Sequence, residues 1–135
     1  MSRQIITTPD APPPAGHYSQ AVRAAGSFVF ISGQTPRKIN GERLELASFA
    51  EQVHQTLSNL RAVARASGLT LDDAVKVTVY LRRHEDRDEF DSLYAEYFVK
   101  PTAARVLVQS GFIGFDVEVD AILLDSRPLR PNSGS

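Results

Sequence analysis

The stretch SFAEQVHQTLSNLRAVARASG, residues 48–68, predicts an amphipathic helix and with it one helical layer of the fold. Its apolar residues recur at steps of three or four, which places them on one helical face: Phe49, Val53, Leu57, Leu60 and Ala64. Ser48 followed by Glu51 matches a capping box, and Gly68 can adopt the left-handed conformation that ends a helix. We therefore expect a helix between these two ends.

A strand and a second helix follow this stretch. In AVKVTVYL, residues 74–81, apolar and polar side chains alternate as they do in a strand. The next apolar residues return to helical spacing: Phe90, Leu93, Tyr94, Tyr97 and Phe98. Asp86 is a candidate cap for this second helix, and Pro101 lies beyond its end.

Five further segments have the character of strands: 4–8, 20–24, 28–33, 104–109 and 115–124. The sequences AAGS and SGFIG between neighbouring segments predict one hairpin of 20–24 with 28–33 and another of 104–109 with 115–124. Because helices connect the strands in the middle of the chain, those strands are expected to run parallel. The order predicts an α+β fold with a mixed sheet of about six strands and two helices on one face.

The other face of this sheet also needs a cover. Phe28 and Phe30 alternate with Val29 and Ile31, so this strand is apolar on both sides. Two helices cover only one face, and exposed apolar patches of that size are rare on monomers. A second copy of the chain is the simplest cover, so we expect a homo-oligomer formed through this face.

Composition limits the class of protein. The 135 residues fit one domain, which we expect to span residues 1–127, with residues 128–135 as a disordered tail. The absence of cysteine excludes disulfides and thiolate nucleophiles, and a formal charge of −1 gives no electrostatic reason to expect nucleic acid. No segment has the apolar core of a signal peptide or the roughly 20 apolar residues of a membrane span, so we expect a cytoplasmic protein without membrane contact.

The stretch TAARVLVQ, residues 102–109, places Arg105 on a largely apolar strand, where a guanidinium needs a partner. The last strand has three acidic residues on one face, Asp116, Glu118 and Asp120. If the predicted hairpin closes symmetrically, Glu118 lies about one residue from Arg105. Spacing alone leaves open an exposed salt bridge or a site where Arg105 binds an anion and Glu118 handles a proton or water. The three histidines lack the spacing of metal ligands, so we expect no metal.

Three separated stretches resemble, in order and spacing, the RidA/YjgF family of reactive-intermediate deaminases: GHYSQAV at 16–22, FVFISGQTP at 28–36, and ARVLVQ at 104–109 followed by EVDAI at 118–122. The resemblance covers nearly the whole chain. It implies a chorismate-mutase-like subunit assembled as a homotrimer, with clefts between neighbouring subunits. It also implies hydrolysis of 2-aminoacrylate and related enamines or imines to 2-oxo acids and ammonia, without a cofactor.

The same resemblance assigns roles to individual residues. Arg105 matches the family's carboxylate-binding arginine, so its partner is expected to be the substrate, and Glu118 matches the glutamate that orients water and accepts a proton. Tyr18, Ser32 and Gly33 match residues that line the cleft. Without the resemblance, Tyr18 is equally a surface tyrosine, Ser32 a strand-end group and Gly33 a bend.

Several positions depart from the family pattern. Leu107 stands where the family commonly has Cys, Thr or Ser, His17 replaces a proline, and Asp91 replaces an asparagine. The connection SGFIGFD, residues 110–116, is two residues shorter than usual, which brings Phe112 or Phe115 near the cleft.

Alternatives to general imine hydrolysis stay open at this point. One is a specialised deaminase of a ring-cleavage product such as 2-aminomuconate, which needs more room and apolar contact. Another is a non-catalytic protein that binds 2-oxo acids or other metabolites in the same cleft. Nucleic-acid binding, reported for some relatives, is disfavoured by the charge of the chain.

Overall fold

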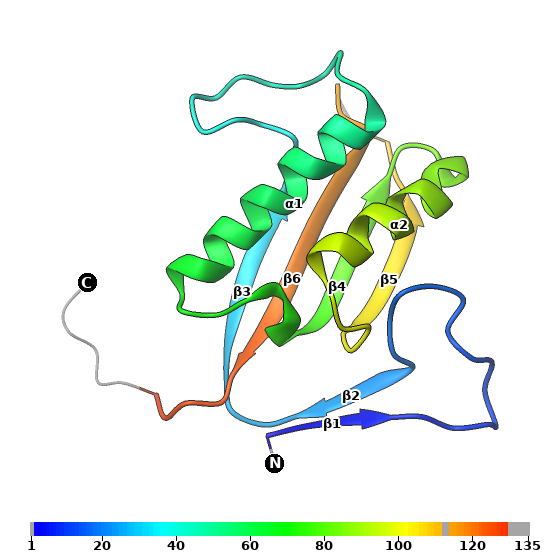
Figure 1. Cartoon of the computed structure of the whole chain (residues 1–135), viewed down its shortest axis with the longest axis vertical. Helices are drawn as coiled ribbons and strands as arrows, with labels where there is room; N and C mark the ends of the chain where they lie inside the picture. The colour runs from blue at the N-terminus through cyan, green and yellow to red at the C-terminus, as the bar shows by residue number, and fades with distance from the viewer. Residues whose placement is uncertain (1, 112–113, 130–135) are drawn as a thin grey trace.

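Two helices lie on one face of a four-stranded mixed sheet in this computed structural model, which describes residues 2–111 and 114–129 (Figure 1). The helices are α1 (Phe49–Ala66) and α2 (Arg87–Tyr97), with short 3-10 turns η1 (Leu71–Asp73) and η2 (His84–Asp86). The sheet order is β3 (Ser27–Gln34), β6 (Val117–Asp125), β4 (Ala74–Leu81) and β5 (Ala104–Gln109). A separate ribbon pairs β1 (Arg3–Ile6) with β2 (Ala21–Ala24).

Helix α1 confirms the expected helix and its ends. The Glu51 backbone N–H donates to Ser48 Oγ at 3.2 Å, and Gly68 has φ +80° just past the C-terminus. The predicted apolar face packs on β6 and β3, with Val53, Leu57, Leu60 and Ala64 fully buried. In α2 the expected cap is wrong: Asp86 makes no capping side-chain hydrogen bond, because η2 leads directly into this helix and supplies a carbonyl to its first N–H.

The predicted strands form, but neither predicted hairpin does. Strand β2 pairs with β1 instead of β3, and β5 pairs in parallel with β4 instead of with β6. The expected six strands are therefore divided between the four-stranded sheet and the ribbon. The physical reason is β6, which lies between β3 and β4 and pairs antiparallel with both. In this central position every second side chain of β6 is buried. A strand in a hairpin at the edge of the sheet would leave more of these side chains exposed.

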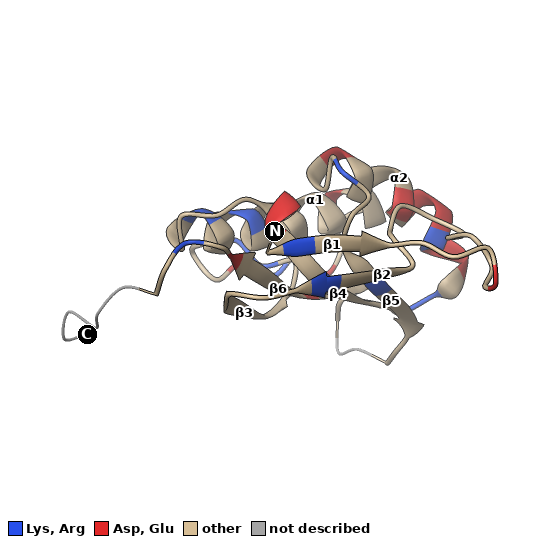
Figure 2. Ribbon diagram, turned by 90° about the horizontal axis from the view of Figure 1, so that it is seen from below, with Lys and Arg blue, Asp and Glu red and all other residues tan. Residues whose placement is uncertain are grey.

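Helices and ribbon occupy different places around the sheet, as the turned view makes plain (Figure 2). The ribbon runs across the end of the sheet at which β4 and β5 begin (Figure 1), and just before β2 Ser19 bridges to Ala104 at the start of β5. Arg3 fixes the ribbon to η1 by donating from its guanidinium to the carbonyl oxygens of Asp72 and Asp73. The segment between β1 and β2 therefore returns along the edge of the sheet close to α2.

The face of the sheet opposite the helices is open and apolar in the single chain. Phe30 is 74% exposed, and several other apolar side chains on this face are more than a third exposed: Phe28, Val106 and Val108. These are the side chains for which a cover was expected. None of the helices in the described ranges is long and apolar enough to cross a membrane.

Candidate functional site

Arg105 points to the helix side of β5. It stands opposite Val77 of β4, whose side chain is fully buried beneath the helices, and residues opposite one another in a sheet share a face. The Arg105 side chain is only 4% exposed. Its guanidinium carbon lies 4.7 Å from the ring centre of Tyr94 and 5.0 Å from that of Tyr18, so two aromatic rings flank the cation.

The charged partner of Arg105 lies within the chain. Arg105 Nη1 is 2.7 Å from Asp91 Oδ1, and the His17 backbone N–H donates to both Asp91 oxygens at 3.2 and 3.1 Å. The expectation that the substrate is a partner of Arg105 stays a prediction, and within the chain α2 already places an aspartate opposite the guanidinium. The Arg105 Nη1 contact lacks the alignment of a hydrogen bond, and within the described residues this nitrogen has no hydrogen-bond partner.

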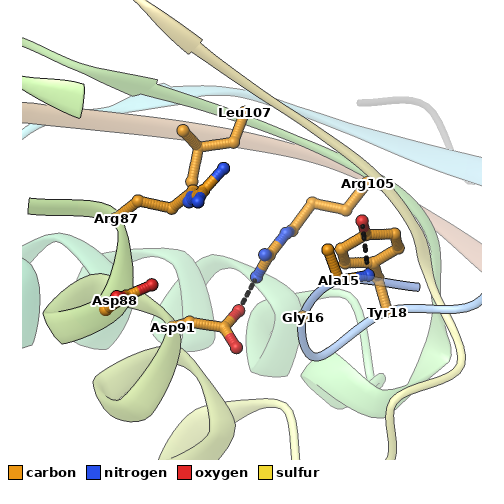
Figure 3. A pocket seen from close by; sticks show the side chains of 8 residues that line it. All are labelled: Ala15, Gly16, Tyr18, Arg87, Asp88, Asp91, Arg105 and Leu107. Atoms are coloured by element: carbon orange, nitrogen blue, oxygen red, sulfur yellow. Dashed lines mark hydrogen bonds and ion pairs between the residues drawn. The ribbon is translucent and has the colours of Figure 1, made fainter. Parts of the chain in front are cut away.

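A cavity of about 150 Å³ opens beside this ion pair, and we call it the arginine pocket (Figure 3). It is lined by Ala15, Gly16, Tyr18, Arg87, Asp88, Asp91, Arg105 and Leu107. Gly16 allows the loop to approach closely, since a Cβ at this position would lie 3.0 Å from Arg105 Nη2 and 3.1 Å from Asp91 Oδ1. The Ala15 N–H donates to the Tyr18 hydroxyl at 3.1 Å, which orients that ring over the guanidinium.

Glu118 lies on the opposite face of the sheet. It stands opposite Tyr80, which alternates with the buried Val79 and Leu81 and therefore points away from the helices. Along β4, Tyr80 is three residues beyond Val77, the residue opposite Arg105. The predicted proximity of Glu118 to Arg105 within one chain is wrong, because it depended on a hairpin that β4 interrupts.

Two other predicted site residues accompany Glu118. A Cβ at Gly33 would lie 2.1 Å from Glu118 Oε2, so only glycine leaves room for that carboxylate in its present position. Ser32 is exposed beside it, in the irregular part of the β3–β6 register. We call Ser32, Gly33 and Glu118 the glutamate face. The six predicted site residues thus form two groups of three, with Tyr18, Arg105 and Leu107 in the arginine pocket.

The sequence did not reveal the contribution of α2 to the pocket. Arg87, Asp88 and Asp91 all line it, and Tyr94 packs against Arg105 from the next turn. Spacings of three and four residues place such side chains on one helical face, which is the signal that could have found them. Burial raises the pKa of Tyr94 well above its ordinary value, against an opposing effect of the Arg105 charge, so its hydroxyl stays neutral.

Phe115, one of the two residues expected near the cleft, packs away from the arginine pocket in the single chain. Phe115 is buried, with the Arg43 guanidinium carbon 4.5 Å from its ring centre, and it does not line the pocket. Asp116, which follows Phe115, is held by the buried Gln52 of α1. The Gln52 side chain accepts from the Asp116 N–H at 2.9 Å and donates to the Asp116 carboxylate at 3.2 Å. Phe112, the other candidate for the cleft, lies outside the described residues.

Comparisons with known proteins agree with this architecture. Residues 8–124 match the family model described as endoribonuclease L-PSP. A RutC family protein of Pyrococcus horikoshii is 39% identical, covering 89% of this chain and 96% of that protein. A 2-iminobutanoate/2-iminopropanoate deaminase of Dermatophagoides farinae is 35% identical, covering 78% and 82%. The crystal structure of RidA from an Antarctic Psychrobacter has a TM-score of 0.69 at 34% identity, covering 90% and 99%. The chain therefore belongs to the RidA/YjgF family.

Proposed function

We propose that this protein hydrolyses imines and enamines of small 2-amino acids to 2-oxo acids, without a cofactor. The single most important observation is Arg105, an almost fully buried cation beside a cavity, between two aromatic rings. A guanidinium in such a place is suited to bind a carboxylate through paired hydrogen bonds. The similarity to a protein named as a 2-iminobutanoate/2-iminopropanoate deaminase supports the reaction class.

In the proposed reaction the enamine first tautomerises to the imine, and water then adds to the imine carbon. Glu118 orients this water and takes one of its protons as the C–O bond forms and the C=N bond becomes C–N. In the resulting carbinolamine the nitrogen takes this proton back from Glu118, the C–N bond breaks as the C=O bond forms, and the hydroxyl proton passes to Glu118, so that ammonia and the 2-oxo acid leave. Arg105 holds the carboxylate through both steps, and Tyr18 forms one wall.

This proposal requires a second copy of the chain. Arg105 and Glu118 point away from opposite faces of one sheet, so one chain does not direct both at the same substrate. The open face carries the exposed Phe28 and Phe30 close to the glutamate face, which supports burial of this surface by a neighbour. We propose a homotrimer in which each site combines the arginine pocket of one subunit with the glutamate face of the next.

The reaction is tested by generating 2-aminoacrylate in situ from serine with a dehydratase and trapping the surviving imine with semicarbazide. Wild-type protein is expected to reduce the trapped product, and Arg105→Ala is expected to lose at least about 100-fold in kcat/KM with the loss of a paired, charge-assisted contact. Equal trapping by wild type, variant and buffer would overturn general imine hydrolysis. Larger amino-dienoate substrates then test the specialised deaminase that Leu107 in the pocket favours.

The shared site is tested by mixing two inactive variants. Arg105→Ala and Glu118→Gln subunits are unfolded and refolded together, so that some sites receive an intact Arg105 and an intact Glu118 from different chains. Random mixing in a cyclic trimer restores about a quarter of the sites. Each variant refolded alone is the control. No recovery in mixed oligomers of confirmed composition would contradict a site shared between subunits.

Two other functions are separated by the same protein samples. A non-catalytic binder would bind 2-oxo acids with equal affinity in wild type and Glu118→Gln, and would show no turnover in either. The family description raises RNA cleavage, but the chain has 15 Lys and Arg against 16 Asp and Glu, and acidic residues gather around α2 (Figure 2). Salt-sensitive RNA binding with cleavage that survives Arg105→Ala would favour that function instead.

A further inference from the structure

The arginine pocket contains a balanced set of charges rather than a positive one. Two arginines and two aspartates line it, Arg87 and Arg105 with Asp88 and Asp91, so their formal charges cancel. A ligand that brings only a carboxylate adds an uncompensated negative charge to this cavity. A ligand that also brings a positive nitrogen leaves the cavity neutral, which matters because charges interact more strongly where water is scarce.

Asp91 is the acidic residue whose position makes binding depend on whether the ligand carries a positive nitrogen beside its carboxylate. Its Oδ1 lies 2.7 Å from Arg105 Nη1, so a carboxylate bound to the other guanidinium nitrogens lies next to the Asp91 carboxylate. Like charges at such a separation repel, and Arg105 has to satisfy both. The ion pair therefore weakens the binding of simple anions at the same arginine that attracts them.

Asp91 also keeps unused acceptor capacity. A carboxylate offers about four lone-pair positions. Among the described residues, Asp91 receives the single N–H of His17, shared between its two oxygens, and an ion pair from Arg105 that lacks hydrogen-bond alignment. Its side chain is 27% exposed, whereas that of Arg105 is 4% exposed, so the carboxylate is the more accessible partner of the pair. A donor N–H in the cavity can therefore reach it.

We propose that Asp91 makes the site selective for ligands with a protonated nitrogen next to the carboxylate, such as the iminium form of a 2-imino acid, and against the 2-oxo acid product. This inference rests on the proposed function and names the charge state of its substrate. In this proposal Arg105 holds the carboxylate while Asp91, which faces the same guanidinium (Figure 3), accepts from the adjacent nitrogen.

The same arrangement promotes product release. When the C=N⁺ bond has been replaced by C=O and the nitrogen has left as ammonium, the ligand keeps its negative charge but no longer offers a donor to Asp91. The 2-oxo acid that remains is then repelled by Asp91 and held by Arg105 alone. Asp91 is thus a specificity-determining residue, and the water-directing role stays with Glu118.

The test compares two stable ligands with the same carbon skeleton, L-2-aminobutanoate and 2-oxobutanoate, by titration calorimetry on the assembled protein. The wild type is expected to prefer the amino acid. Asp91→Asn, which keeps an acceptor for the His17 N–H, is expected to shift the ratio of the two dissociation constants about tenfold towards the 2-oxo acid. Asp91→Glu keeps the charge and is expected to retain the preference.

Asp88→Asn is the matched control, since it removes one negative charge from the same pocket lining without touching the Arg105 ion pair. Asp88 belongs to the same charge balance, but it is exposed and screened by water, so its ratio is expected to shift much less than that of Asp91→Asn, by about twofold. If both ligands bind and Asp91→Asn leaves their ratio unchanged, or Asp88→Asn shifts it equally, the inference is overturned while the carboxylate site stands. If neither ligand binds the wild type, the inference and the proposed carboxylate site fail together.

Discussion

The arginine pocket and the glutamate face differ in how far a single chain completes them. In the arginine pocket, Arg105 already has an acidic partner in Asp91, two flanking rings and a cavity. On the glutamate face, Glu118 has no ion pair or hydrogen bond among the described residues, and the surface around it is apolar and open. Under the proposed function, the carboxylate-binding half of the site is organised within the subunit, whereas Glu118, the proposed catalytic carboxylate, depends on assembly. Four experiments test this difference.

The largest effect is expected from Phe30→Asp, which places a charge at the most exposed apolar residue of the open face. If a neighbour covers this face, a buried unpaired carboxylate opposes assembly and the proposed shared sites are lost with it. Light scattering is expected to show smaller particles, with activity reduced to background. Ile39→Asp, at a fully exposed loop position, is the control and is expected to change neither. An unchanged mass for Phe30→Asp would show that the open face is not the contact surface.

Glu118→Gln is expected to have the next largest effect. General base catalysis contributes roughly 10²–10⁴-fold to rate, and the amide keeps the shape of the side chain without its basicity. We expect kcat to fall within that range, while the melting temperature, the oligomer mass and the affinity for 2-oxobutanoate stay the same. A variant with wild-type kcat would remove Glu118 from the mechanism and leave the arginine pocket unaffected.

Gly33→Ala is expected to act through Glu118, with a smaller effect. The new Cβ would lie 2.1 Å from Glu118 Oε2, and the flexible carboxylate moves aside at little cost in stability. Misplacement of the catalytic group by about 1 Å is expected to lower kcat about tenfold or more. Gly111→Ala is the matched control, because a Cβ there meets nothing within 4 Å. Equal kcat values for the two variants would show that the position of Glu118 is not critical.

Tyr94→Phe is expected to have the smallest effect, and it tests whether the pocket is complete within the chain. The Tyr94 hydroxyl is buried without a hydrogen-bond partner among the described residues, so its removal gives up no such bond. The ring beside Arg105 is retained. We expect the free energy of unfolding to change by less than about 1 kcal/mol, or to rise, in urea denaturation. A loss of about 2 kcal/mol or more would show that the hydroxyl has a partner in the assembled protein.

The sequence predicted the elements better than their arrangement. The α1 helix and the β4 strand follow from periodicity within a few residues of sequence, and the structure confirms both. The parallel course of the strands joined by helices was predicted correctly, but the two hairpins were mispredicted because turn patterns are local, while β6 pairs with β3 some ninety residues earlier in the chain. Nothing in AAGS or SGFIG encodes that distant partner.

For the candidate site, too, the residues were predicted better than their arrangement in space. The resemblance supplied the residues, and alternation placed Arg105 and Leu107 on one face of β5, as the pocket confirms. The pairing of Arg105 with Asp91 depends on where α2 crosses the strand, and the position of Glu118 depends on the strand order. Both are tertiary facts that a pattern of neighbouring residues does not contain.

The central position of β6 also has a consequence for synthesis of the chain on the ribosome. Both antiparallel neighbours of β6 are made earlier, and each waits with an unpaired edge until residues 117–125 have emerged. Until then the nascent chain holds two helices and the β4–β5 pair, but no continuous sheet on which to pack them. The sheet is therefore completed only once β6 is available, and until then its exposed strand edges are what a chaperone has most to protect.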